Sequence, residues 1–93
     1  MYIFEKKDKT GRVIYLTQER WSHILKHPEM QDSLAQIERT LIFPQRITFH
    51  KYDESIRNYY YFLKEKKRFL KLLVKYLNGR GFLITAYLVE NIR

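Results

Sequence analysis

Two histidines are spaced so that they could take part in proton transfer. His23 and His27 lie four residues apart, and on a helix they share one side with Arg20, away from Trp21 and Ile24. An imidazole changes charge near neutral pH, so either one could act as a general acid or base. A place near a helix C-terminus favours the charged form of His27, which suits a general acid or a phosphate contact. Solvated surface histidines are the alternative that this spacing leaves open.

Other common chemistries find little support. Two histidines at this spacing could bind zinc, but the chain has no HExxH pattern and no evident third ligand. Cysteine is absent, which excludes disulfides, thiolate zinc sites and thiol nucleophiles. There is also no P-loop, no glycine-rich dinucleotide turn and no nucleophile elbow. We therefore expect neither a metal nor an organic cofactor.

Positive charge is concentrated in one part of the chain. The 93 residues carry a formal net charge of +8. The stretch 64–80 holds one acidic residue, Glu65, and seven basic ones: Lys64, Lys66, Lys67, Arg68, Lys71, Lys75 and Arg80. Such a stretch attracts polyanions, which makes nucleic acid the first partner to consider and anionic lipid the second. A solvated loop on a soluble surface is the simpler alternative.

RNA is a substrate that these residue types could cleave, because its 2′-OH is a built-in nucleophile. Cleavage needs a base to take the 2′-OH proton, an acid to protonate the leaving 5′-oxygen, and cations to stabilise the phosphorane. Histidine, lysine, arginine, tyrosine and threonine side chains suffice. Lys75 is the best candidate for the phosphate-stabilising cation, because a position in the middle of a strand would hold it more rigidly than the loop lysines.

The first half of the chain predicts a hairpin and two helices. Residues 2–4 and 13–16 are β-prone and flank a turn that contains Gly11. A helix from Gln18 to Lys26 follows, with Thr17 as its N-cap, and it ends at His27 because Pro28 disfavours helical geometry there. A second helix, from about Gln31 to Ile42, has its apolar stripe on Leu34, Ile37 and Leu41 and ends before Pro44.

The second half predicts four strands joined by short polar turns. Alternating runs cover 46–52, 58–63, 69–77 and 82–89, which indicates an antiparallel meander. The expected fold is therefore α+β, with an N-terminal hairpin or short strands and two helices packed on a four-stranded antiparallel sheet. The length fits one domain, residues 1–93. No apolar run approaches membrane-spanning length, so we expect neither export nor membrane insertion. The expected location is the cytoplasm.

Alternation assigns the strand residues to two faces of the sheet. The third run places Leu70, Leu72, Val74 and Tyr76 in the core and Phe69, Lys71, Leu73 and Lys75 opposite. The fourth run places Phe82, Ile84, Ala86 and Leu88 on one side and Leu83, Thr85, Tyr87 and Val89 on the other.

His50 reaches the lysine-bearing face if the register holds, whereas a slip of one residue would bury it. At least one of Tyr59, Tyr60 and Tyr61 should join it. Ammonium groups bind phosphate and aromatic rings stack on bases, so this face is the expected nucleic-acid surface. The alternative is that the tyrosines only favour β-structure and the strand lysines only discourage edge pairing.

Two parts of the sequence resemble a known group of nucleases. Residues 16–24 (LTQERWSHI), followed by His27-Pro28-Glu29-Met30, are similar to the opening of small phage-type nucleases of the barnase/EndoU/colicin/RelE-like (BECR) group. Tyr59-Tyr60-Tyr61, Leu73-Val74-Lys75 and residues 81–87 (GFLITAY) are similar to its later strands. The resemblance spans about Val13 to Tyr87. Two departures are Lys26, where we expect arginine, and Lys71, in a strand that we expect to be mostly apolar.

This resemblance implies two helices on a four-stranded antiparallel sheet and metal-independent cleavage of tRNA or mRNA, often in a toxin. Carried over by position, the catalytic candidates are His23, His27, Lys75, Thr85 and Tyr87. The expected RNA-binding residues are Arg20, His50, Tyr59, Tyr61, Lys66, Lys67, Arg68, Lys71 and Arg80. One alternative is a non-catalytic RNA- or DNA-binding module. Another is an interaction protein whose exposed Leu73, Leu83 and tyrosines dock a partner, such as an antitoxin or a second copy of the chain.

Overall fold

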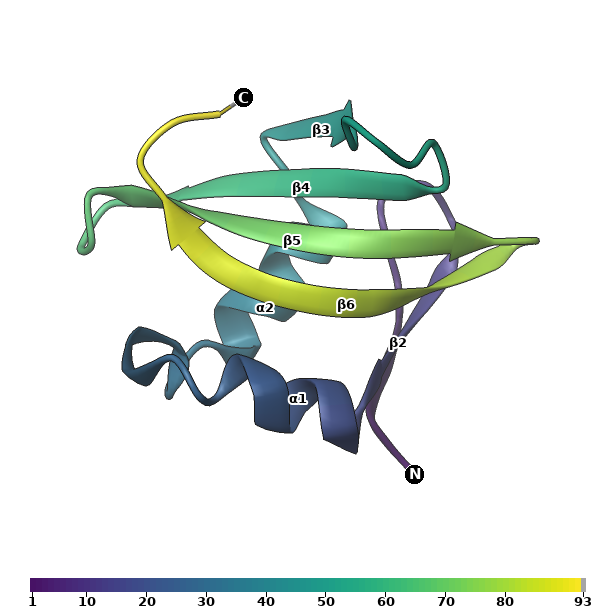
Figure 1. Ribbon diagram of the computed structural model, residues 1–93, viewed down its shortest axis with the longest axis horizontal. Coiled ribbons are helices and arrows are strands. Elements are labelled where there is room, and N and C mark those ends of the chain that lie inside the picture. The colour runs from purple at the N-terminus through teal and green to yellow at the C-terminus, as the bar shows by residue number, and fades with distance from the viewer. Residues whose placement is uncertain (93) are drawn as a thin grey trace.

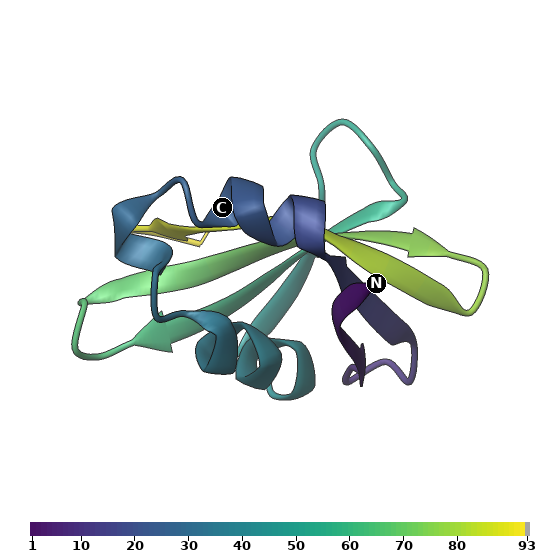
Figure 2. The ribbon, with the colours of Figure 1, turned by 90° about the horizontal axis from the view of Figure 1, so that it is seen from below.

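Among the residues that the structure describes, six strands form one mixed sheet, and two α-helices lie on one of its faces (Figures 1 and 2). The computed structural model describes residues 1–92. Its elements are β1 (Tyr2–Lys7), β2 (Val13–Thr17), α1 (Gln18–Ile24), the 3₁₀ helix η1 (Pro28–Met30), α2 (Leu34–Ile42), β3 (Arg46–Phe49), β4 (Ile56–Leu63), β5 (Arg68–Leu77) and β6 (Arg80–Val89). Neither α-helix of this described part is long and apolar enough to cross a membrane.

The strand order is β1-β2-β6-β5-β4-β3, with a parallel pairing between β2 and β6 and antiparallel pairings elsewhere. The α+β class is confirmed, but the expectation of a four-stranded antiparallel sheet was wrong, because the N-terminal hairpin joins the sheet edge. The absence of a side chain at Gly81 of β6 lets the neighbouring strands approach closely, because a Cβ there would lie 2.6 Å from the Lys75 carbonyl oxygen of β5 and 3.1 Å from Ile14 Cδ1 of β2. No local sequence pattern predicts that β2 and β6, which lie far apart in the chain, will pair.

The helix ends follow the capping residues, with shifts of two to three residues from the sequence prediction. Thr17 caps α1, its hydroxyl accepting from the Arg20 backbone N–H at 3.1 Å. His27 is extended (φ −89°, ψ 114°), as the following Pro28 requires. The first helix stops at Ile24 instead of Lys26, and the second starts at Leu34 instead of Gln31, after η1 and a turn that leads to the N-cap residue Ser33.

The core lies between the helices and the sheet. Ile37 and Leu41 of α2 and Leu70, Leu72 and Val74 of β5 are fully buried in it. These are the residues that the apolar stripe of the helix and the alternation of the strand indicated. Each such side chain contributes roughly 1.5–3 kcal/mol by leaving water, so packing holds the helices on this face.

A buried polar network ties the β1–β2 turn to the sheet. Asp8 Oδ1 accepts hydrogen bonds from the backbone N–H groups of Thr10 (2.9 Å) and Arg12 (3.1 Å), and its Oδ2 accepts from the Tyr59 hydroxyl. The Tyr59 and Tyr76 hydroxyl oxygens lie 2.5 Å apart. Burial raises the pKa of Tyr59 well above its usual range, and the hydrogen bond to Asp8 adds to the shift. The network therefore fixes the N-terminal hairpin to β4 and β5.

A β-bulge changes which residues of β6 face the core. Leu73 pairs with Thr85, but Val74 pairs with Leu83, so Ile84 has no opposite residue. Leu83 is consequently fully buried, which corrects our expectation that it is exposed for docking a partner. Phe82, paired with Lys75, changes to the other face. Beyond the bulge the assignment holds, with Ala86 buried towards the helices.

Candidate nucleic-acid interface

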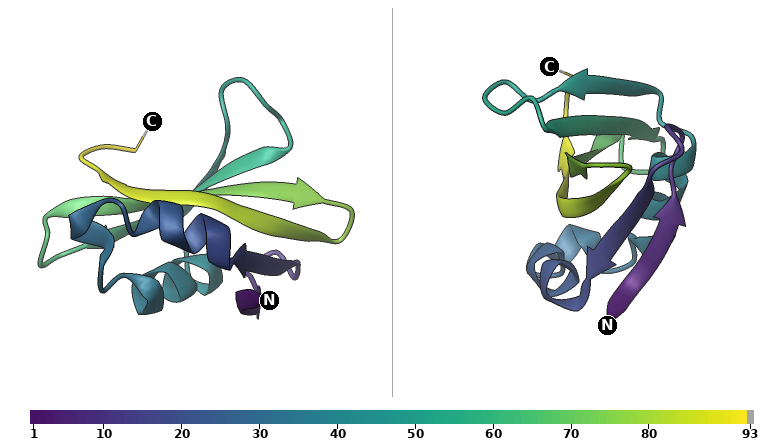
Figure 3. Two further views of the ribbon diagram at one scale, coloured as in Figure 1. Left: turned by 60° about the horizontal axis from the view of Figure 1, so that its bottom comes forward. Right: turned by 90° about the vertical axis from the view of Figure 1, so that its right-hand side faces the viewer.

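We call the side of the sheet away from the helices the open face (Figure 3). Directly paired residues of neighbouring strands point to the same face, so the register sorts the side chains of the open face into rows. The first row is His50, Ile56, Lys75, Phe82 and Tyr15. The second row is Thr48, Asn58, Leu73 and Thr85, and the third is Arg46, Tyr60, Lys71 and Tyr87. Lys75, Thr85 and Tyr87 therefore share one face, as the sequence predicted.

Lys75 is held by an ion pair that the sequence did not indicate. Its Nζ lies 3.2 Å from Oδ2 of Asp53, in the β3–β4 loop that rises on the open-face side (Figure 3, left). Asp53 Oδ1 accepts from the Ser55 hydroxyl (2.6 Å) and backbone N–H (2.9 Å). These bonds from Ser55, followed by the bond from Lys75, lower the pKa of Asp53 to about 2. The ammonium group is thus fixed in position and partly neutralised.

A shallow pocket joins Lys75 to the start of α1. Its volume is about 350 Å³, and its lining includes Thr17, Glu19, Arg20, Lys75 and Phe82. Arg20 comes from the first turn of α1, where the Thr17 cap orients the helix. Two cations and one carboxylate, that of Glu19, therefore line one pocket at the rim of the open face, and the two cations are the groups that could bind a phosphate. The expected role of Arg20 as an RNA-binding residue fits this position.

The three histidines have different surroundings. His50 lies in the row of Lys75, because its backbone N–H bonds to the Ile56 carbonyl (3.0 Å) and Ile56 pairs with Lys75. Its Nδ1 is buried without a hydrogen-bond partner among the described residues. His23 and His27 are exposed, and within residues 1–92 neither imidazole makes a hydrogen bond or lines the pocket of Lys75. The register thus brings His50, and not the helical pair, into the row of Lys75.

Lys71 lies between two aromatic rings in the third row. Its Nζ is 5.7 Å from the centroid of the Tyr60 ring and 5.6 Å from that of the Tyr87 ring, as in cation–π pairs. Tyr60 was not in our predicted site; it pairs directly with Lys71, but it is fully buried, so its ring supports Lys71 from below and offers no stacking surface to a base. Tyr59 and Tyr61 point to the helix side instead, and Tyr59 is fully buried, which corrects the expectation that they face nucleic acid. Because three tyrosines follow one another, the sequence alone does not show which of them point to which face; the pairing with β5 decides it.

An aromatic cluster at the other end of the open face also escaped the sequence analysis. The rings of Tyr2 and Tyr15 lie 4.6 Å apart, and those of Tyr15 and Phe82 lie 5.4 Å apart, between centroids. The cluster exists because β2 pairs with β6 and because the bulge turns Phe82 to this side. It extends the aromatic surface beyond the pocket of Lys75.

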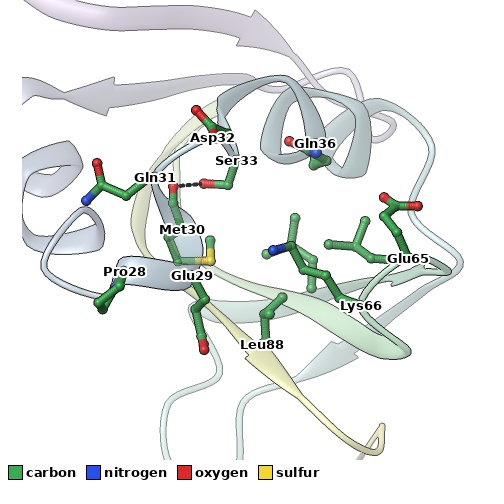
Figure 4. A pocket seen from close by; sticks show the side chains of 12 residues that line it. Pro28, Glu29, Met30, Gln31, Asp32, Ser33, Gln36, Glu65, Lys66 and Leu88 are labelled. Carbon is green, nitrogen blue, oxygen red and sulfur yellow. Dashed lines mark hydrogen bonds between the residues drawn. The ribbon is translucent and has the colours of Figure 1, made fainter.

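The hairpin lysines and arginines lie at the periphery. Lys66 lines a different pocket of about 290 Å³ on the helix side, formed by η1, the start of α2 and the β4–β5 hairpin (Figure 4). Arg68 is 3.9 Å from Glu29 on the same side. Lys67 is exposed in the β4–β5 turn and Arg80 in the β5–β6 turn. Of the seven basic residues in 64–80, Lys71 and Lys75 are thus the two that project from the middle of the open face.

Within residues 1–92, no group of three or more His, Asp or Glu side chains is placed to hold a metal ion. Comparison with protein-family models, curated proteins and solved structures finds no match to this chain. The resemblance to BECR nucleases therefore remains a prediction.

Proposed function

We propose that this protein is a metal-independent endoribonuclease that binds RNA on its open face. The observation that supports this proposal is the common orientation of Lys71, Lys75, Thr85 and Tyr87, which project from two neighbouring strands onto the face opposite α1 and α2 (Figure 3). Cations, hydroxyl donors and aromatic rings on one surface match the phosphates, sugars and bases of RNA.

The proposed reaction is internal transphosphorylation. The 2′-oxygen attacks the adjacent phosphorus, the bond from phosphorus to the 5′-oxygen breaks, and the products are a 2′,3′-cyclic phosphate and a 5′-hydroxyl. A base takes the 2′-OH proton and an acid protonates the leaving oxygen. The Lys75 ammonium stabilises the charge on the phosphorane, and the hydroxyls of Thr85 and Tyr87 are available as further donors.

The register supports His50 as one member of the acid–base pair. His50 and Lys75 are separated by Ile56 alone, so their backbones lie two strand spacings apart, roughly 10 Å. A phosphate above Ile56 would lie between the imidazole and the ammonium group. His23 remains a candidate for the other member, since it lies on α1 three residues after Arg20, which lines the pocket of Lys75. His27 lies beyond the end of α1, so its candidacy rests on the sequence resemblance alone.

Incubation of the purified protein with total tRNA in excess EDTA tests the proposal. We expect fragments that end in cyclic phosphate, and a loss of cleavage in Lys75→Ala. Lys9→Ala is the matched control, because it removes an exposed lysine of the β1–β2 turn. Intact RNA at high protein concentration would refute the nuclease, and full activity of Lys75→Ala would refute the site. Single His→Gln variants at 23, 27 and 50 then identify, by the limb of the pH–rate profile that each one removes, which histidine acts.

A second candidate is RNA or DNA binding without cleavage. The Lys75–Asp53 ion pair favours it, because a carboxylate already occupies one side of the ammonium group. Binding that weakens steeply with salt but yields no product would select this function. A toxin role is part of the main proposal: an acidic antitoxin that covered the open face would compete with RNA for the same cations.

A further inference from the structure

An alternating series of aromatic rings and guanidinium groups begins at the end of β3 and continues through β4 and β5 to the β1–β2 turn. The Arg57 guanidinium carbon lies 4.0 Å from the centroid of the Phe49 ring and 4.9 Å from that of Tyr76, and the Arg12 guanidinium carbon lies 4.0 Å from that of Tyr76. The order is Phe49, Arg57, Tyr76, Arg12, and we call these four residues the cation–ring stack. None of them belongs to the rows of the open face.

Hydrogen bonds at its sides hold the stack in place. The Tyr76 hydroxyl is 2.5 Å from that of Tyr59, Arg57 donates to the Glu54 carbonyl, and Arg12 donates to the Thr10 hydroxyl at 3.2 Å. A ring backed by a fixed cation is preorganised, so little conformational freedom is lost when a second ring stacks on it.

The outer end of the stack is open. Phe49 is the final residue of β3, which is an edge strand of the sheet, and it is 66% exposed. One side of its ring meets Arg57, and solvent has access to the rest.

The two arginines of the stack lack acidic partners. Among residues 1–92, neither guanidinium forms an ion pair with a carboxylate, and Arg12 Nε is buried without a hydrogen-bond acceptor. An exposed ring next to uncompensated positive charge matches a nucleotide, which brings a flat base and a phosphate together.

We infer that Phe49 is the platform of a nucleobase-stacking subsite backed by Arg57, and that the protein therefore takes RNA with an unpaired base at the β3 edge. This inference rests on the proposed binding of RNA to the open face. Phe49 directly precedes His50, and successive residues of a β-strand point to opposite faces of the sheet. An RNA chain that passes His50 and continues around the edge of the sheet therefore reaches Phe49. A base inside a duplex has both faces stacked on its neighbours and cannot occupy the platform.

Fluorescence anisotropy with a labelled single-stranded 2′-O-methyl RNA decamer tests the inference, since this probe lacks the 2′-OH nucleophile and reports binding alone. Phe49→Leu should weaken binding by about 5- to 100-fold, the effect of one base–aromatic stack. Phe49→Trp should retain it. Phe43→Leu is the matched control, because Phe43 is 63% exposed and has no cation over its ring among the described residues. The duplex of the same sequence should bind Phe49→Leu and the unmodified protein alike.

A direct readout of stacking comes from tryptophan fluorescence. The chain has one tryptophan, so Phe49→Trp in a Trp21→Phe background, with an unchanged circular dichroism spectrum, carries its sole tryptophan on the platform. The single strand should quench its emission and the duplex should not. If this variant is misfolded, the anisotropy comparison decides alone.

Each outcome separates the subsite from the proposed function. Phe49→Leu binding within twofold of the unmodified protein, while Lys71→Ala weakens it, would overturn the subsite and leave RNA binding on the open face standing. Absence of binding to either probe would overturn both. Binding with the Phe49 dependence, but no cleavage of unmodified RNA, would overturn the nuclease and support the subsite. Self-association that Phe49→Leu abolishes, without an effect on RNA binding, would identify the platform as a protein contact and overturn it.

Discussion

Asp53→Asn should increase the affinity of the protein for RNA. The carboxylate of Asp53 lies 3.2 Å from the Lys75 ammonium group and is where a phosphate oxygen would bind. Since the pKa of Asp53 is lowered to about 2 from its ordinary 3.8, the carboxylate is fully ionised at neutral pH. The carboxylate is protonated, and its ion pair with Lys75 is lost, only as the pH falls from about 4 towards 2. At pH 7, RNA must therefore compete with a complete negative charge, and asparagine removes that competitor without changing the size of the side chain.

The size of the effect follows from the exposure of the pair. The Lys75 and Asp53 side chains are 40% and 42% exposed, so solvent screens their attraction. Exposed pairs of this kind shift an equilibrium by roughly 1.5- to 5-fold, which is the expected gain in affinity. Lys75 can then neutralise one more phosphate, which releases one more counterion from the RNA and makes the slope of log K against log[salt] steeper by about 0.7 for single strands. The advantage of the variant should accordingly be about 2.5-fold larger at 50 mM than at 200 mM KCl.

Anisotropy titrations of the non-cleavable single-stranded decamer at these two salt concentrations measure both quantities. Glu54→Gln is the matched control, because it removes one negative charge from the same loop and leaves the ion pair intact. Equal gains from the two variants would show that only the net charge of the loop matters. A loss of affinity in Asp53→Asn would show that Asp53 positions Lys75 for RNA instead of competing with it, and would refute the reasoning.

Three further predictions concern the scaffold. Tyr59→Phe should lower the free energy of unfolding in urea by about 1–3 kcal/mol, because it leaves a buried oxygen of Asp8 without a donor; an unchanged midpoint would contradict the network. Because the pKa of Tyr59 is raised above its ordinary 10.0, the neutral phenol is the form that the fold stabilises. Its contribution is thus complete below about pH 10 and is lost as the pH rises further, so the gap between the unmodified protein and Tyr59→Phe should narrow at alkaline pH. Lys67→Gly should raise the melting temperature, with a gain of roughly 0.5–1 kcal/mol, since Lys67 has a φ of 54° that suits glycine better; a lower melting temperature would argue against strain there. Gly81→Ala should destabilise the protein by roughly 1–3 kcal/mol, because the new Cβ would lie 2.6 Å from the Lys75 carbonyl oxygen, and it should speed amide exchange at Ile14, because the same Cβ would lie 3.1 Å from Ile14 Cδ1; slow exchange at Ile14 in the variant would contradict the role of Gly81 in the packing of β2 on β6.

The sequence by itself determined the features that depend on residues close together in the chain. Thr17 caps a helix because its hydroxyl reaches a backbone N–H three residues on. Pro28 ends the helical geometry at His27 through a steric effect on the preceding residue. The alternation of β5 places Lys71 and Lys75 on one side, because strand side chains repeat every second residue. Expected boundaries were wrong by two or three residues where η1 separates the helices.

Only the tertiary structure decided which side chains meet. The bulge at Ile84 shifts the pairing by one residue, which buries Leu83 and turns Phe82 outward. The partner strand, and not the tyrosine run, assigns Tyr60 to the open face. Asp53 reaches Lys75 across 22 positions of the chain. Such contacts depend on strand register and on loop closure, which bring distant segments of the chain together. The free energies of both depend on residues far apart in the sequence, so a short stretch of sequence does not predict them.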